Sequence, residues 1–153
     1  MKIYLFLFAI TLLILDQVSK YYISTHFDTS KFLNILPFLS IYYSQNYGVA
    51  FSFLQNSNHL FISLFSIFII IFMAFCLNKS KSRFTLLGYT MIISGAVGNL
   101  LDRIRLGYVV DFIFFHISNI FNFAIFNLAD SFITIGVLLI IFYEFLYKLP
   151  SCK

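Results

Sequence analysis

Two aspartates, Asp111 and Asp130, are the residues whose setting best suits acid–base chemistry. Asp111 lies in the stretch GYVVDFIFF, which contains no Lys or Arg, and Asp130 carries the formal charge of the stretch FNLADSFITIG. Burial in apolar surroundings raises the pKa of a carboxyl group. Two carboxyls held close together share one proton, so the protonated member can polarise a carbonyl while the ionised member takes a proton from water. Such a pair suits hydrolysis without a covalent intermediate.

The sequence lacks the motifs of several other kinds of catalytic or binding site. The chain has no Gly-x-Ser-x-Gly, no His-Glu-x-x-His and no phosphate-binding loop. Its three histidines are scattered, and His59 and His116 are expected at interfaces rather than as metal ligands. No basic cluster interleaves with stacking residues, as a nucleic-acid site requires. We therefore expect no metal, no cofactor and no nucleic-acid partner.

The composition indicates that lipid surrounds most of the chain. Of its 153 residues, 61% are hydrophobic and 10% are charged, with a mean hydropathy of +0.93. Soluble domains are about 45–50% apolar and about 25% charged. A membrane helix needs about 20 mostly apolar residues, and four segments qualify, at about 3–23, 59–77, 84–103 and 127–147. We predict an all-α membrane protein of one domain, residues 1–153, with four transmembrane helices.

With four spans, most of the basic residues near helix ends fall on one side of the membrane. These residues are Lys2, Lys79, Lys81, Arg83, Lys148 and Lys153. Because Lys and Arg are enriched at cytoplasmic ends, that side is predicted to be cytoplasmic and to hold both termini. The outer connections are 24–58 and 104–126. The first contains SIYYSQNYGVAFSF, which favours short strands, so we expect a small extracytoplasmic β-sheet beside short outer loops.

This topology brings polar residues together at one depth, near the outer leaflet. They are Asp16 and Lys20 on the first helix, Asn99, Asp102 and Arg103 at the end of the third, Asp111 in the second outer connection, and Asn127 and Asp130 at the start of the fourth. A charge at the centre of a membrane helix costs about 2.5–3.5 kcal/mol on insertion scales. These residues therefore need a reason to be there. For Arg103, binding a lipid phosphate or a neighbouring carbonyl is one such reason.

Purely structural roles would explain several other members of this group. Asp16 and Lys20 are four residues apart on one helix face, which suits an ion pair that only pins the helix. Asn127 suits a helix N-cap, and a carboxylate at Asp130 gains from the helix dipole. Capping does not account for Asp111. The chemical hypothesis therefore depends on Asp111.

Five short blocks together resemble the lipoprotein signal peptidase family, also called signal peptidase II. The blocks are DQVSK at 16–20, NYGVAF at 46–51, SGAVGNLLDR at 94–103, GYVVDF at 107–112 and FNLAD at 126–130. They are similar, in the same order, to the family's D-Q-x-x-K, N-x-G-A-A-F, G-G-A-x-G-N-x-x-D-R, G-x-V-x-D-F and F-N-x-A-D. Two positions depart from this pattern, Val49 for Ala and Ser94 for Gly. The resemblance covers essentially the whole chain.

The resemblance implies an intramembrane aspartyl endopeptidase of the bacterial inner membrane, with its active site near the outer leaflet. Such an enzyme removes signal peptides from diacylglyceryl-modified prolipoproteins, cutting N-terminal to the lipidated cysteine. Asp111 and Asp130 match the catalytic pair. The residues implied to support that pair or to bind substrate are Asp16, Lys20, Asn46, Gly48, Asn99, Asp102, Arg103, Asn127 and Ala129. The expected partners are prolipoproteins, membrane lipid and globomycin-type inhibitors, and no metal is implied.

Two other classes of function stay open on the residues alone. Acidic residues within a membrane also serve as proton relays, so a small proton- or ion-coupled carrier is the alternative. The acids gather at one leaflet, however, and no inverted repeat is visible. A non-catalytic scaffold would tolerate Asp→Asn changes. Since one chain has enough polar residues for the whole site, we expect a monomer.

Overall fold

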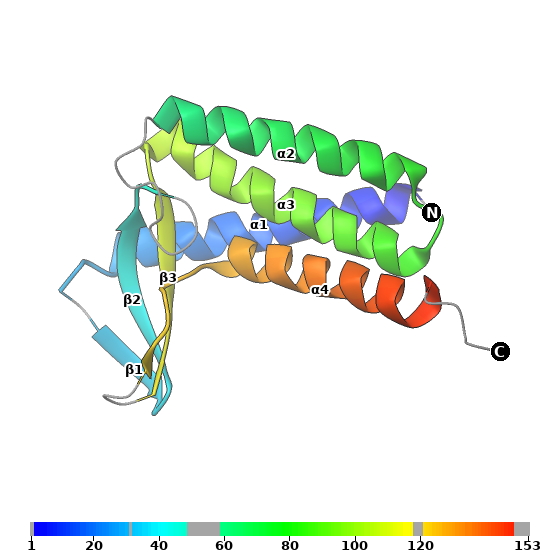
Figure 1. Cartoon of the computed structure of the whole chain (residues 1–153). Helices are drawn as coiled ribbons and strands as arrows, with labels where there is room; N and C mark the ends of the chain where they lie inside the picture. Colours follow the sequence, from blue (N-terminus) through cyan, green and yellow to red (C-terminus); the bar gives the residue numbers. More distant parts are fainter. Residues whose placement is uncertain (1, 31, 49–58, 118–120, 149–153) are drawn as a thin grey trace.

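Four helices run side by side, and a small sheet lies across one end of them (Figure 1). The computed structural model describes residues 2–30, 32–48, 59–117 and 121–148. The helices are α1 (Lys2–His26), α2 (His59–Lys79), α3 (Arg83–Leu106) and α4 (Leu128–Lys148). All four are long and apolar enough to cross a membrane. The four predicted spans are therefore confirmed, although α1 and α3 each extend three residues beyond the predicted ends, at 23 and 103.

Helix α3 is the centre of the bundle. In the most apolar stretch of α3, 56% of the residues are buried, against 6–17% in the other three helices. It packs against α1, α2 and α4, whereas the other helices leave most of their apolar side chains on the outside. Exposed apolar surface of this extent is expected where lipid is the solvent. Several polar residues of α3 are consequently buried, among them Ser94, Asn99 and Asp102.

Helices α3 and α4 approach each other closely because small residues line their contact. A Cβ added at Gly88 would lie 2.7 Å from the carbonyl oxygen of Gly136, and one at Gly95 would collide with the carbonyl oxygen of Ala129. Small residues allow such close backbone approach between membrane helices. This contact brings the first turn of α4 against the C-terminal half of α3.

The sheet is antiparallel and has the strand order β1-β2-β3-β4. Its strands are β1 (Phe32–Leu36), β2 (Leu39–Asn46), β3 (Val109–Ile117) and β4 (Phe121–Asn122). Strand β2 arises in the connection where short strands were predicted. Residues 49–53 of that prediction lie outside the described residues. Strand β3 was not predicted; it pairs with β2 and places Ser44 opposite Asp111.

Gly107 ends α3 and turns the chain into β3. Its φ of 82° is left-handed, and its N–H donates to the carbonyl oxygen of Arg103 at 3.1 Å. Glycine adopts this helix-ending conformation without a steric penalty. The following VVDFIFF is rich in β-branched and aromatic residues, which favour a strand. Val110 and Phe112 pack into a small core with Ile23 and Tyr43, so strand alternation turns Asp111 to the opposite face.

Candidate active site

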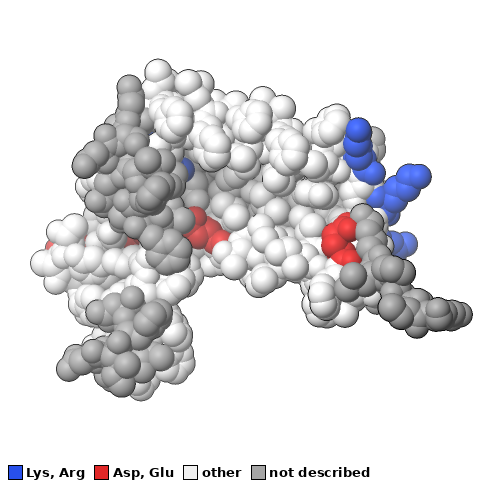
Figure 2. Space-filling view, viewed as in Figure 1, with Lys and Arg blue, Asp and Glu red and all other residues white. Residues whose placement is uncertain are grey.

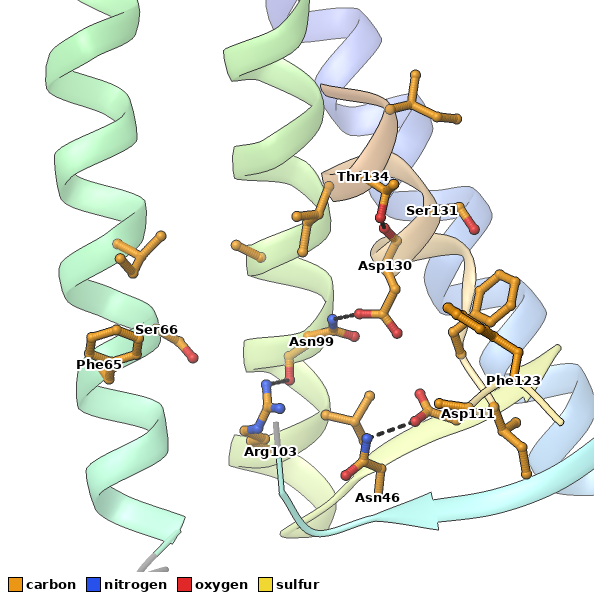
Figure 3. Close-up of a pocket in the computed structure, with 18 residues that line it drawn as sticks. Asn46, Phe65, Ser66, Asn99, Arg103, Asp111, Phe123, Asp130, Ser131 and Thr134 are labelled. Carbon is orange, nitrogen blue, oxygen red and sulfur yellow. Dashed lines mark hydrogen bonds between the residues drawn. The ribbon is translucent and has the colours of Figure 1, made fainter. Parts of the chain in front are cut away.

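Asp111 and Asp130 line the same cavity at the sheet end of the bundle. The cavity has a volume of about 610 Å³ (Figure 3). Its polar lining includes Asn46, Asn99 and Arg103, and its walls are mostly apolar side chains. Asp111 comes from β3 and is 2% exposed, while Asp130 lies in the first turn of α4. Two carboxyls, one from a strand and one from the helix that follows it in the sequence, thus line one largely apolar space.

Asn127 connects the two carboxyls. Its Nδ2 donates to Asp111 Oδ1 at 2.6 Å, and its Oδ1 accepts from the backbone N–H of Asp130 at 2.9 Å. The N–H of Asn127 donates in turn to Asp130 Oδ2 at 3.3 Å. This reciprocal pair is a capping box, which satisfies free donors at a helix start. The predicted N-cap is confirmed, and the same side chain also holds Asp111.

Two further asparagines hold the remaining oxygens of the pair (Figure 3). Asn46 Nδ2 donates to Asp111 Oδ2 at 2.8 Å, and Asn99 Nδ2 donates to Asp130 Oδ1 at 2.8 Å. Asn99 Oδ1 also accepts from Asn127 Nδ2 at 3.2 Å. Both carboxyl groups are therefore fixed by amides from β2, α3 and the start of α4. None of these amides can itself accept or release a proton at ordinary pH.

Arg103 fastens the end of β2 to α3. Its Nη2 donates to the carbonyl oxygen of Gly48 at 2.9 Å, and Gly48 N–H donates to Asn46 Oδ1 at 2.9 Å. Of the two predicted roles for Arg103, the structure shows the one in which it binds a neighbouring carbonyl. This contact orients Asn46, which holds Asp111.

A buried cluster of three charges lies behind the pair. Lys20 Nζ is 3.0 Å from Asp16 Oδ2 and 2.9 Å from Asp102 Oδ2. It also donates to Asn99 Oδ1 at 2.8 Å. The expected ion pair between Asp16 and Lys20 is present, and Lys20 has a second carboxylate partner in Asp102. The backbone N–H of Ala129 donates to Asp16 Oδ1 at 2.9 Å.

All of the residues predicted for the site lie in this one network or directly beside it. Gln17 also belongs to this network, although it was not among the predicted site residues. Its Nε2 donates to Asp16 Oδ2 at 3.2 Å, to Asp102 Oδ1 at 3.1 Å and to the carbonyl oxygen of Gly98 at 3.2 Å. Gln17 is the second residue of the DQVSK block, which matches the family's D-Q-x-x-K, and that was the available signal. The apolar wall contributed by α2, including Phe65 and Ile69, carried no motif that could have indicated it.

The environment of Asp111 favours its protonated form. Burial, followed by the nearby negative charge of Asp130, raises the pKa of the Asp111 carboxyl to about 7, against the opposing effect of the hydrogen bonds from Asn46 and Asn127. A carboxyl with such a pKa is protonated in about half of the molecules at pH 7 and can release its proton there. It can therefore act as an acid near neutral pH.

Neither His26 nor His116 takes part in this network. His116 lies in the sheet, where its Nε2 is 2.7 Å from Ser40 Oγ, and His26 stacks on Tyr22 at the end of α1. Within the described ranges, no three His, Cys, Asp or Glu side chains are grouped in a way that could hold a metal ion.

A solved protein structure shares both the helices and the sheet. The structure, described as a bacterial membrane enzyme determined by the in meso method at 2.3 Å resolution, superposes with a TM-score of 0.84 and is 33% identical in sequence. The match covers 97% of this chain and 93% of the other. Together with the four spans, this likeness places the chain in the class of multi-pass bacterial membrane enzymes.

The sequence comparisons identify the family within that class. Residues 8–146 match the family described as signal peptidase (SPase) II. The lipoprotein signal peptidase of Bartonella henselae is 44% identical over 137 residues, covering 86% of this chain and 82% of the relative. That of Streptococcus agalactiae serotype Ia is 44% identical over 140 residues, covering 90% and 88%. The chain belongs to the signal peptidase II family, and it is a membrane peptidase.

Proposed function

We propose that this chain removes signal peptides from diacylglyceryl-modified prolipoproteins, cutting N-terminal to the lipidated cysteine. The observation that carries the proposal is the meeting of Asp111 and Asp130 in one apolar-walled cavity, joined through Asn127. Membership of the signal peptidase II family and the names of the relatives support the substrate class. The Asp→Asn variants described in the Discussion test it.

In the proposed reaction, Asp111 is the acid and Asp130 is the base. Asp111 gives a hydrogen bond to the scissile carbonyl oxygen, while ionised Asp130 takes a proton from the attacking water. The start of α4 favours a negative charge at Asp130, because the helix dipole is positive there. Collapse of the tetrahedral intermediate then breaks the C–N bond, and the proton that Asp130 took from water passes to the leaving amine, so that the pair again carries one proton. The asparagines hold both carboxyls throughout without taking up the proton themselves.

The cavity walls suit an apolar substrate. The cavity is bounded by α2 on one side, through Phe65 and Ile69, and by α4 on the other, through Ile133 and Ile135. Burying apolar side chains or an acyl chain against such walls is favourable at about 25 cal/mol per Å². Apolar contacts with these walls would thus hold a lipid-modified signal segment in place, with its scissile bond beside the carboxyls.

The rate of cleavage should fall above about pH 7. The active pair carries one proton, and loss of the Asp111 proton, with its pKa raised to about 7, leaves two carboxylates and no acid. The value of kcat/KM is therefore expected to drop by about tenfold per pH unit on the alkaline side. Initial rates on a diacylglyceryl prolipoprotein in detergent micelles, measured from pH 5 to about 9, check this.

A His116→Gln variant is the control for this profile. Histidine is the side chain that ordinarily titrates near neutral pH, and His116 is the histidine that lies on the same strand as Asp111. We expect the alkaline limb to be unchanged in this variant. If the limb disappeared, the proton lost near pH 7 would belong to the histidine and not to the pair.

We further propose that both termini lie in the cytoplasm and that the cavity lies near the outer leaflet. Figure 2 shows Lys and Arg side chains gathered at the end of the bundle opposite the sheet, which supports this orientation. Lys79, Lys81 and Arg83, all exposed, belong to this group. Alkaline phosphatase, which needs oxidising conditions for its disulfides, should be inactive when fused after Lys153 and active when fused after Leu106. The reverse result would invert the topology.

Three other expectations stand with this proposal. Inhibition by globomycin-type cyclic peptides stays a prediction of the resemblance, and the same cleavage assay checks it. A monomeric state stays a prediction as well, supported by the fact that one chain supplies the whole hydrogen-bond network. Contact with membrane lipid follows from the exposed apolar helices. The comparisons give no support to a carrier.

A further inference from the structure

A second groove lies at the end of the bundle away from the carboxyl pair. It has a volume of about 340 Å³ and lies between α1, α3 and the end of α2 with the turn that follows it. Small-molecule sites have volumes of about 300–1,000 Å³. No residue that lines this groove, called here the turn groove, also lines the cavity of the carboxyl pair. The turn groove is therefore a separate site.

The polarity of the turn groove changes along its length. Asn78 and Ser80 line it beside the turn, whereas Phe6, Leu86 and Ile93 make its walls apolar. The hydroxyl of Thr90, which also lines it, donates to the carbonyl oxygen of Leu86 at 2.8 Å and leaves no free donor. Phe6 is 60% exposed, so the groove can be reached from the surrounding lipid. A groove that is polar at one end and apolar along the rest suits an amphiphile.

The length of the turn groove matches one leaflet of a bilayer. Helix α3 begins at Arg83, and Ile93 is ten positions further along it, which is about 15 Å at 1.5 Å per residue. The hydrocarbon core of a bilayer is about 30 Å thick, so one leaflet contributes about 15 Å. An acyl chain in the groove would thus begin at the level of the turn and end near the middle of the membrane.

Three cations flank the polar end of the turn groove. Lys79, Lys81 and Arg83 are exposed and alternate with the polar residues of NKSKSR at 78–83, a stretch without an acidic residue. Within the described part of the chain, none of the three forms an ion pair with a carboxylate. Glu144, near the end of α4, is on a helix that contributes no described residue to the groove. The charge beside the groove is therefore complementary to an anionic headgroup.

We propose that the turn groove binds one anionic phospholipid, with an acyl chain along α3 and the phosphate beside Lys81 and Arg83. Each Lys or Arg near a membrane surface strengthens the binding of anionic lipid by roughly fivefold. Two such residues should favour an anionic lipid over a zwitterionic one by about 10- to 25-fold. The site goes beyond peptide cleavage and does not depend on the carboxyl pair.

Native mass spectrometry of the full chain released from detergent micelles tests the proposal. The probes are dioleoyl phosphatidylglycerol and dioleoyl phosphatidylcholine, which share their acyl chains and differ in headgroup charge. We expect one phosphatidylglycerol per chain, with half-saturation at a concentration at least about tenfold lower than for phosphatidylcholine. Glycerol 3-phosphate, which has the phosphate without acyl chains, should not displace it. Equal retention of the two lipids, or displacement by glycerol 3-phosphate, would overturn the proposal.

A charge variant tests the headgroup end of the site. The double change Lys81→Gln and Arg83→Gln should reduce the preference for phosphatidylglycerol to less than about threefold. Lys79 is kept, because its Nζ lies over the Phe75 ring at 4.3 Å. The matched control, Lys148→Gln with Lys153→Gln, removes the same charge from the end of α4 and beyond, and it should keep the preference. A preference that survives the first double change, or falls equally in both, would overturn the proposed headgroup position.

A second pair of variants tests the acyl-chain end. Ala9 lines the turn groove, and Ala9→Phe or the smaller Ala9→Leu should occupy its space and weaken the binding of phosphatidylglycerol by about tenfold. Ile10 is 38% exposed and is not among the residues that line the groove, so Ile10→Phe should leave binding unchanged. Unchanged binding in both Ala9 variants, or an equal loss in Ile10→Phe, would overturn the proposal. Because the readout is lipid binding, failure of the proposed peptidase activity would leave this result unaffected.

Discussion

Replacing either Asp111 or Asp130 with Asn should reduce cleavage of a diacylglyceryl prolipoprotein by at least about 1,000-fold. Asparagine has nearly the same shape and keeps one of the two acceptor oxygens, which preserves one of the two hydrogen bonds from neighbouring residues. The cavity should therefore remain formed. It can neither give up nor take a proton at ordinary pH, and general acid–base catalysis contributes about 100- to 10,000-fold. The loss should appear in kcat. Purified variants in detergent, assayed by the appearance of processed lipoprotein, provide the measurement.

Two further variants provide comparisons for this result, one expected to have no effect and one expected to have a smaller effect. Asp28→Asn removes the same charge from the connection after α1, where Asp28 Oδ1 accepts from the N–H of Ser30, and it should leave cleavage unchanged. Asn127→Ala removes a side chain that holds both members of the pair, and it should cost less than either Asp→Asn change. If Asp111→Asn or Asp130→Asn kept a cleavage rate within tenfold of normal, that residue would have no role in catalysis. If Asn127→Ala lowered the rate as much as either of these changes, Asn127 would have a chemical role.

The four spans could be predicted because crossing a lipid bilayer places a strong demand on one continuous stretch of sequence. About 20 consecutive apolar residues are needed wherever a helix crosses the bilayer, and each span met that demand on its own. Strand β3 was not predicted, although its residues VVDFIFF favour a strand, because such a run does not show which strand it pairs with. Strand β3 forms because Gly107 ends α3 and because β3 can pair with the edge of β2. Its pairing therefore depends on residues that are distant in the sequence. The sequence placed Asp111 near α4 but not on a strand.

The polar residues of the site were visible as unusual charges and amides in an apolar chain, but their partners were not. Asp16 and Lys20 suggested a simple ion pair, because spacing along one helix shows only neighbours on that helix. The structure adds Asp102 from α3, a contact that depends on how two helices pack. Gln17 was missed for the same reason, since its three acceptors include two from another helix. Local spacing identifies candidates, and helix packing decides which of them meet.

That packing is itself open to test at Gly95. A Gly95→Ala variant should lower kcat/KM by about 100-fold and also lower the thermal stability. The added Cβ would collide with the carbonyl oxygen of Ala129 and lie 2.8 Å from Ile133 Cγ1. A backbone carbonyl cannot rotate away as a side chain can, so the first turn of α4 has to move. Overpacking of this kind costs about 1–3 kcal/mol, and the displaced turn carries Asp130 away from Asn99, its 2.8 Å partner on α3.

Gly88→Ala is the matched control, because it adds the same methyl group to the same interface further from the site. Its Cβ would lie 2.7 Å from the carbonyl oxygen of Gly136. Gly95 is seven positions after Gly88 on the same helix, which is about 10 Å along the axis. Both variants should lower the unfolding temperature, measured in the same detergent, but Gly88→Ala should cost less than tenfold in kcat/KM. Equal losses of activity would show that α4 shifts as one rigid body, so that the contact beside Asp130 has no special importance for the geometry of the pair.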